Sequence, residues 1–244
     1  VSCSGFAAPG VDSALVAALG LPPTVARAHI GFMGCHGALN GLRVADAFAA
    51  ADPGARVLLC AVELCSLHYQ YSSDADKQVA NSLFADGAAA LAGTASDSAT
   101  PAGWRVAAAG SCVLPDSRDA MTWSIGDHGF EMTLSPRVPE LIHTHLRLWL
   151  ESWLARQSLS LDQVATWAVH PGGPRILSAV EQTLTLPPRA CAVSREVLAE
   201  HGNMSSPTIL FILQRLMSAG APLPCVALAF GPGLVVEGIL FDRK

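Results

Sequence analysis

The stretch 56–63 constrains the fold most, because it is an unbroken apolar run of the length of one β-strand. Such a run is typical of a central strand that is covered on both faces. Residues 37–51 before it carry apolar side chains at helical spacing, and this helix ends at Asp52-Pro-Gly54. Residues 25–33 lead into the helix through a turn, so that the predicted order is strand, helix, strand. This order of elements predicts an α/β protein.

Composition excludes several classes of function. The chain has 244 residues, of which 51% are hydrophobic and 14% charged, and its net charge is −5. Lysine occurs only at Lys77 and Lys244, so no basic stripe is available for a nucleic acid. The apolar segments 57–67 and 224–240 are interrupted well before the roughly 20 apolar residues of a membrane span. The excess of apolar residues instead predicts buried strands and a large interface between subunits.

The cysteines indicate the compartment. Seven cysteines, an odd number, occur without the pattern of a signal peptide. They predict reduced thiols and a cytoplasmic location rather than a disulfide framework. The chain contains no Cys-x-x-Cys motif, and we expect no metal site.

Cys35 is the candidate nucleophile, because it lies between glycines at the start of the predicted helix 37–51. Backbone N–H groups point outward at such a place, and the helix dipole favours a thiolate there. The glycines on either side allow another group to approach closely. The alternative is an inert, buried cysteine that behaves as a small hydrophobe.

Apolar patterns predict the remaining elements. A long helix begins after Pro136, and we expect Trp149 and Trp153 to be buried along one of its faces. We expect further helices at 12–19, 175–184, 195–200 and 208–217, strands at 85–92, 104–114 and 164–169, two strands joined through 231–233 after residue 226, and loops or turns at 69–77, 96–103 and 115–130.

Two polar residues lie where these elements end. His170 directly follows the predicted strand 164–169, and ligands of open α/β sheets collect at the carboxyl ends of strands. Asn203 lies in the turn before the helix 208–217, where Ser205 or Ser206 is the expected N-cap. A role of Asn203 in turn chemistry alone is the alternative.

Several separated motifs together resemble those of type III polyketide synthases, the chalcone synthase-like group. They span 31–38, 167–177, 200–206 and 229–234, with supporting agreement at 5–10 and 81–90. The resemblance implies a thiolase-type fold, an α/β protein with layers α/β/α/β/α, built from two similar halves and working as a homodimer. It divides this chain into 1–115, the remainder of the half that carries the cysteine, and 116–244, the half that carries histidine and asparagine. It also implies that part of the N-terminal half, with its first strands and its basic residues for coenzyme A, is absent from this sequence.

The resemblance assigns roles to three residues. It implies that Cys35 accepts an acyl group, with His170 and Asn203 as its partners. An imidazole beside Cys35 and a helix N-terminus behind it are expected to depress the pKa of the thiol. Decarboxylation of a malonyl thioester develops enolate charge, which His170 and the Asn203 amide are expected to stabilise. No cofactor is implied, since acyl-CoA and malonyl-CoA are substrates.

The resemblance also implies the residues of the substrate pocket. Phe84 resembles the gate between a coenzyme A tunnel and the cavity, with an ordinary core aromatic as the alternative. Met132 falls where a second gating phenylalanine is expected. The other pocket positions implied are Cys3, Cys65, His68, Trp123, Ser205 and Gly233, and the first four resemble bacterial members of the family.

The implied activity is the extension of a starter acyl-CoA by decarboxylative condensation with malonyl-CoA, followed by cyclisation to a pyrone or a resorcinol-type product. A second enzyme hypothesis is a ketoacyl synthase of fatty-acid initiation, which makes a single condensation with the same three residue types. The non-enzyme hypothesis is an inactive fragment that only dimerises.

Overall fold

The structure is a computed structural model and describes residues 1–242 except 6, 72, 74 and 96–102. Its strands are β1 Arg56–Glu63, β2 Gly87–Thr94, β3 Arg105–Val113, β4 Met121–Gly126, β5 Gly129–Leu134, β6 Thr166–Val169, β7 Cys225–Gly231 and β8 Val235–Asp242. Its α-helices are α1 Val11–Ala18, α2 Gly37–Ala51, α3 Ala75–Leu83, α4 Val138–Ala155, α5 Pro174–Leu184, α6 Ala192–His201 and α7 Ser206–Ser218, with short 3-10 helices η1 Gly34–His36, η2 Cys65–His68 and η3 Leu161–Gln163. Most of the predicted turn at 96–103 lies outside the described residues.

The larger sheet has the strand order β3-β8-β7-β6, and every residue of β7 is buried. Strand β7 pairs in parallel with β6 and antiparallel with β8. Because side chains alternate along a strand, β7 contributes to two separate cores. Val226, Leu228 and Phe230 pack with α4 and α5. The smaller residues Cys225, Ala227 and Ala229 pack with α2 and α7.

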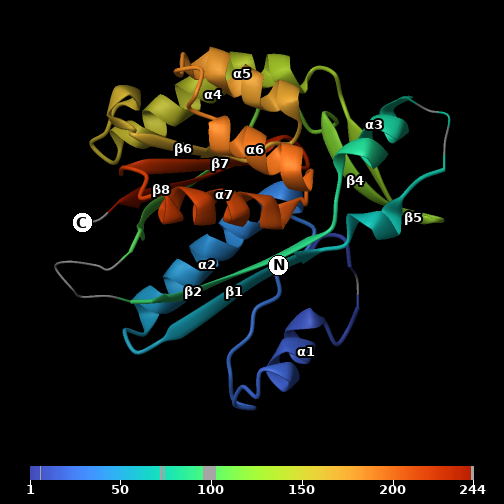
Figure 1. The fold of residues 1–244 in the computed structure, drawn as a ribbon, viewed down its shortest axis with the longest axis vertical. Coiled ribbons are helices and arrows are strands. Elements are labelled where there is room, and N and C mark those ends of the chain that lie inside the picture. Colours follow the sequence, from blue (N-terminus) through green and yellow to red (C-terminus); the bar gives the residue numbers. More distant parts are fainter. Residues whose placement is uncertain (6, 72, 74, 96–102, 243–244) are drawn as a thin grey trace.

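The second sheet contains β1 and β2, which are antiparallel and pack against the other side of α2 and α7. Helices α2 and α7 therefore lie between two sheets, and the described elements form the layers α4/α5, large sheet, α2/α7 and small sheet (Figure 1). Within the described part of the chain only one face of β1 is fully buried, since Leu59 and Ala61 are buried whereas Leu58 is 45% exposed and Cys60 and Val62 are half-buried. The expectation of cover on both faces is thus not met there, because an unbroken apolar run hides which face packs inward. The predicted strand at 25–33 is wrong, since this segment forms only an isolated bridge between Gly31 and Ser2.

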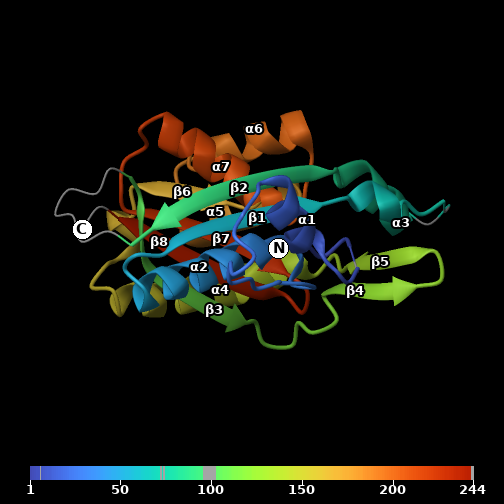
Figure 2. The same cartoon turned by 90° about the horizontal axis from the view of Figure 1, so that it is seen from below.

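The predicted loop 115–130 is wrong over most of its length. Strands β4 and β5 form an antiparallel hairpin with Met121 opposite Leu134 and Gly126 opposite Gly129. The cluster of glycine, aspartate and histidine at 126–129 is the turn of this hairpin rather than part of a long loop. Figure 2 shows the hairpin extending from one end of the molecule, where β5 packs against α3.

The predicted burial of the two tryptophans of α4 is confirmed for Trp153, which is 1% exposed, and Trp149 is half-buried. Their rings stack with centroids 5.7 Å apart. They pack on Gly110 of β3 and Gly238 of β8, which face each other in the strand register. A Cβ atom at Gly110 would lie 2.6 Å from Trp153 Nε1. The two glycines thus provide the flat surface on which the aromatic pair lies.

This packing predicts a loss of stability in Gly110→Ala. The added methyl group must displace a buried tryptophan from a packed core, and overpacking of this kind costs about 1–3 kcal/mol. Gly93→Ala is the matched control, since a Cβ atom at Gly93 in β2 has no neighbour within 4 Å. Urea unfolding of both variants measures the difference. Equal stabilities of the two variants would contradict the proposed role of Gly110.

Candidate active site

Cys35 lies in η1, the single turn that leads into α2, and its side chain is 4% exposed. The backbone before it has positive φ angles at Phe32 and Gly34, of 56° and 64°. Glycine is needed at position 34 for a second reason, because a Cβ atom there would lie 2.5 Å from Pro232 Cδ. The tight turn brings Cys35 to the wall of a cavity of about 290 Å³.

Burial raises the pKa of the Cys35 thiol to about 11, and the charge of Glu63 acts in the same direction. Hydrogen bonding by the Ser205 and Asn203 side chains lowers this pKa, but by less than burial raises it. The expectation of a depressed pKa is therefore not met. Complete desolvation of the thiolate outweighs the effect of the helix N-terminus.

His170 directly follows β6 and is 0% exposed. Neither of its ring nitrogens has a hydrogen-bond partner among the described residues, so it does not bond to the Cys35 sulfur in this state. Burial lowers the pKa of His170 to about 3, and nearby His36 contributes to this shift. The imidazole is therefore neutral at pH 7, and it can act as a general base only where a partner raises this pKa.

Asn203 precedes α7, is also 0% exposed, and forms an isolated β-bridge with Phe84. Its Oδ1 accepts a hydrogen bond from the Ser205 backbone N–H at 2.8 Å, which fixes the orientation of the amide. Its Nδ2 has no partner in hydrogen-bond geometry among the described residues, although the amide is close enough to Cys35 to lower the pKa of the thiol. Buried donors are rarely left unsatisfied, so such a group is typical of a site that awaits a ligand.

The elements that carry these three residues pack on one another. Helix α7 contacts both η1 and β6, and η1 also contacts β7. His170 and Asn203 are not part of the cavity wall, whereas Cys35 is. The structure thus gathers the three predicted residues at one end of the large sheet, and their catalytic roles stay a prediction.

Sequence reasoning missed Glu63, whose side chain is 0% exposed. Its carboxylate accepts hydrogen bonds from the Cys3 and Ser4 backbone N–H groups and from the Ser4 and Ser206 hydroxyls, at 2.6 to 3.1 Å. Glu63 therefore connects the start of the chain, the end of β1 and the start of α7. A glutamate at the end of an apolar strand was the only signal in the sequence, because its donors are distant in the chain.

Most of the predicted pocket residues surround the same cavity as Cys35. They are Cys3, Cys65, His68, Phe84, Trp123, Met132 and Ser205. Gly233 does not line the cavity, whereas its neighbour Pro232 does. Burial raises the pKa of the Cys3 and Cys65 thiols as well. Contact with a substrate stays a prediction for all of these residues.

An aromatic cluster of His68, Trp123 and Phe130 forms part of the cavity wall. The rings of His68 and Phe130 stack at 4.5 Å, and Trp123 meets both edge-on. His68 Nδ1 accepts a hydrogen bond from the Phe130 N–H at 3.0 Å, and Nε2 lies 2.7 Å from the Ser4 carbonyl oxygen. Since a carbonyl oxygen only accepts, Nε2 must carry the proton, and the neutral ring donates through one nitrogen and accepts through the other. These two hydrogen bonds fix the orientation of the His68 ring in the cavity wall.

Comparison with known proteins identifies the family of this chain. Residues 1–96 match the N-terminal domain of the chalcone and stilbene synthases, and residues 105–243 match the C-terminal domain. The chain belongs to this family, the type III polyketide synthases.

Individual relatives agree with this assignment. The alpha-pyrone synthesis polyketide synthase-like Pks18 of Mycobacterium tuberculosis is 36% identical over 98% of the chain and 63% of its own length. The 1,3,6,8-tetrahydroxynaphthalene synthase of Streptomyces peucetius is also 36% identical, over 98% of the chain and 65% of its own length. This chain thus spans just under two thirds of these curated relatives.

Solved structures confirm the thiolase-type α/β fold. PKS-I from the brown alga Ectocarpus siliculosus superposes with a TM-score of 0.95 at 34% identity, over 99% of this chain and 67% of that one. The 1,3,6,8-tetrahydroxynaphthalene synthase of Streptomyces coelicolor A3(2) gives a TM-score of 0.92 at 30% identity, over 100% and 70%. None of the described helices is both long and apolar enough to cross a membrane.

The electrostatics of the site predict how Cys35 reacts with iodoacetamide. With a pKa of about 11, the thiol is protonated at neutral pH, so its alkylation rate should keep rising between pH 7 and 10. Glu63→Gln removes a negative charge that raises this pKa. A fall of about one unit in the pKa of Cys35 would increase its thiolate fraction about tenfold at pH 8.

Peptide mapping by mass spectrometry measures the rate at Cys35 alone. Asp86→Asn is the control, since this exposed carboxylate bonds Ser66 and is not among the main causes of the pKa shift of Cys35. Glu63→Gln should also lower stability by about 1–3 kcal/mol, because an amide N–H then faces buried donors. A rate that has already reached its plateau at pH 7, or that Glu63→Gln leaves unchanged, would contradict this account of the thiol.

Proposed function

We propose that this protein loads a starter acyl group from its CoA thioester onto Cys35, extends it by decarboxylative condensation with malonyl-CoA, and cyclises the product to a pyrone or a resorcinol-type aromatic. The observation that carries the proposal is the set of fully buried polar atoms without partners among the described residues, His170 Nδ1 and Nε2 and Asn203 Nδ2, on elements packed around the turn that places Cys35 at the cavity. Membership of the family supports the same reaction.

Loading begins with a protonated thiol and a neutral imidazole. As the starter thioester enters and the side chains close on it, His170 takes the proton of Cys35 while the sulfur attacks the thioester carbonyl. The tetrahedral intermediate then collapses, the bond to the sulfur of coenzyme A breaks, and the imidazolium returns its proton to that sulfur. An acylated Cys35 and neutral His170 remain.

In the extension step His170 and Asn203 act as hydrogen-bond donors. Malonyl-CoA loses carbon dioxide, and the electron pair moves to its α-carbon and carbonyl oxygen as an enolate. The N–H of neutral His170 and the Nδ2–H of Asn203 are the groups available to bind that oxygen, and in a dry site such donors are worth much more than in water. The enolate carbon then attacks the acyl carbonyl and displaces the Cys35 thiolate, which can accept the lengthened chain again.

The cavity favours a short chain. Its volume of about 290 Å³ lies at the lower end of the usual range for small-molecule sites, and the fixed aromatic cluster closes part of its wall. We therefore propose few extensions from a small starter, with Phe84 and Met132 controlling access to the cavity.

No cofactor is proposed beyond the CoA thioesters that serve as substrates. Among the described residues, no group of three or more His, Cys, Asp or Glu side chains is arranged to hold a metal ion. The proposed assembly is a homodimer in the cytoplasm. Free thiols at all seven cysteines and large exposed apolar side chains such as Leu67 and Leu148 support these two points.

The proposal predicts that two variants lose different steps of the reaction. Cys35→Ala should abolish product formation but retain the release of carbon dioxide from malonyl-CoA, since decarboxylation needs the donors and not the thiol. His170→Asn should slow both steps, by about 10²–10³-fold for a lost oxyanion donor. Cys112→Ala, which changes a thiol of β3 outside the cavity, is the control.

The assay supplies malonyl-CoA with short, long and aromatic acyl-CoA starters and follows products and carbon dioxide by mass spectrometry. Product masses that rise by repeated two-carbon units are expected. A single addition would identify a ketoacyl synthase instead, and unchanged product from Cys35→Ala would rule out the proposed chemistry. A wild-type chain that forms no product and releases no carbon dioxide would favour the inactive fragment.

A further inference from the structure

The turn 231–233 between β7 and β8 packs against residues 33–36, which include Cys35. Pro232 is so close to Gly34 that a Cβ atom there would lie 2.5 Å from Pro232 Cδ. A Cβ atom at Gly231 would lie 2.2 Å from His36 Cδ2 and 2.8 Å from the Met33 carbonyl oxygen. The residues on both sides of Cys35 therefore rest directly on this turn, and a shift of the turn moves Cys35.

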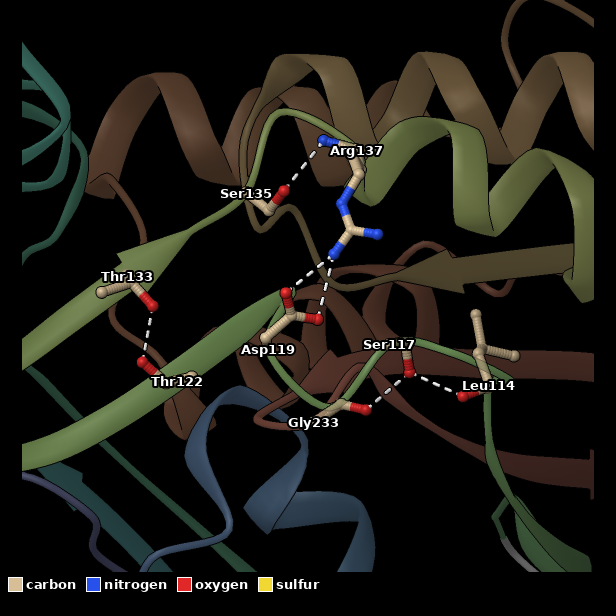
Figure 3. A network of polar contacts seen from close by, with 8 residues as sticks. All are labelled: Leu114, Ser117, Asp119, Thr122, Thr133, Ser135, Arg137 and Gly233. Carbon is tan, nitrogen blue, oxygen red and sulfur yellow. Dashed lines mark hydrogen bonds and ion pairs between the residues drawn. The ribbon is translucent and has the colours of Figure 1, made fainter.

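The turn 231–233 is in turn fixed by Ser117, which is 1% exposed (Figure 3). The Ser117 hydroxyl lies 2.8 Å from the Gly233 carbonyl oxygen and 2.6 Å from the Leu114 carbonyl oxygen. Both partners only accept, so the single hydroxyl proton is shared between them. The Gly233 N–H also donates to the Met121 carbonyl oxygen at 2.8 Å. Gly233 is thus held by both of its backbone polar groups.

This fixation is needed because the backbone at the turn is strained. Gly233 and Leu234 have φ angles of 74° and 48°, and a left-handed conformation is unfavourable for leucine. The segment that carries Ser117 has further contacts, since Arg137 Nη2 donates to both carboxylate oxygens of Asp119 and the Ser135 N–H donates to the Ala120 carbonyl oxygen. A continuous series of contacts therefore links Arg137, at the start of α4, through Ser117 to Cys35.

We propose that Ser117 is a positioning residue for Cys35, which acts through the turn 231–233 and does not touch the substrate. Without its hydroxyl, the Gly233 carbonyl loses a buried donor and the strained turn relaxes away from Gly34. Cys35 then becomes accessible and leaves the geometry in which His170 can take its proton. The effect on turnover rests on the proposed function, whereas the effect on the accessibility of Cys35 does not.

The test compares Ser117→Ala with the wild-type chain in two measurements. Alkylation of each cysteine by iodoacetamide is followed at pH 8 by peptide mapping, and product formation is followed with malonyl-CoA and the best starter. We expect Cys35 to be alkylated about tenfold faster and kcat to fall about tenfold with KM unchanged, since one hydrogen bond is worth up to roughly this factor. Ser117→Thr, which keeps the hydroxyl, should restore both values.

Two controls separate positioning from general destabilisation. Cys191 and Cys225 are fully buried in the two cores and report global unfolding in the same peptide map. Thr122→Val removes the exposed hydroxyl pair with Thr133 in the nearby hairpin and should leave Cys35 unchanged. The inference is overturned if Cys35 reacts in Ser117→Ala as in the wild-type chain, or if Cys191 and Cys225 accelerate along with it. Selective acceleration at Cys35 in a chain that forms no product would sink the proposed function but not the positioning role.

Discussion

The structure depends on the double packing of β7. Its two faces carry side chains of different size, large toward α4 and α5 and small toward α2 and α7. The small face lets α2 and α7 approach the sheet closely, and the strand ends in the turn that supports Cys35. Helix α7, which follows Asn203, packs against β6, which ends just before His170. The packing around β7 therefore brings the three candidate catalytic residues to the same end of the sheet.

Complete burial determines the charge state of that site. Both the thiol of Cys35 and the imidazole of His170 are neutral at pH 7, since burial raises the pKa of the first and lowers that of the second. A buried polar group without a partner costs about 1–3 kcal/mol, so His170 and Asn203 reduce the stability of the unliganded protein. In the proposed reaction a thioester or enolate oxygen would supply the missing acceptor, and removing that cost would contribute to its binding.

The sequence was a good guide where local signals were complete. The bounds of α2 and β1 were predicted correctly, because Asp52-Pro-Gly54 separates a helical period from an apolar run. Cys35, His170 and Asn203 could be singled out from motifs, although not how they lie. The hairpin β4–β5 was missed because its turn resembles a loop, and Glu63 because its four donors come from distant segments. The raised pKa of Cys35 could not be predicted either, since desolvation depends on packing that no local pattern contains.

Reactivity and cavity shape are coupled through one turn. Pro232 lines the cavity with one side and supports Gly34 with another, while Gly231 beside it supports His36. A larger or smaller residue at 232 would change the volume of the cavity and would also change the position of Cys35. Trp123 and Met132 also line the cavity, from the paired strands β4 and β5, and this hairpin is joined to the same turn by the hydrogen bond from the Gly233 N–H to the Met121 carbonyl oxygen. The shape of the cavity and the position of the nucleophile therefore depend on the same turn, and a substitution at Pro232 changes both.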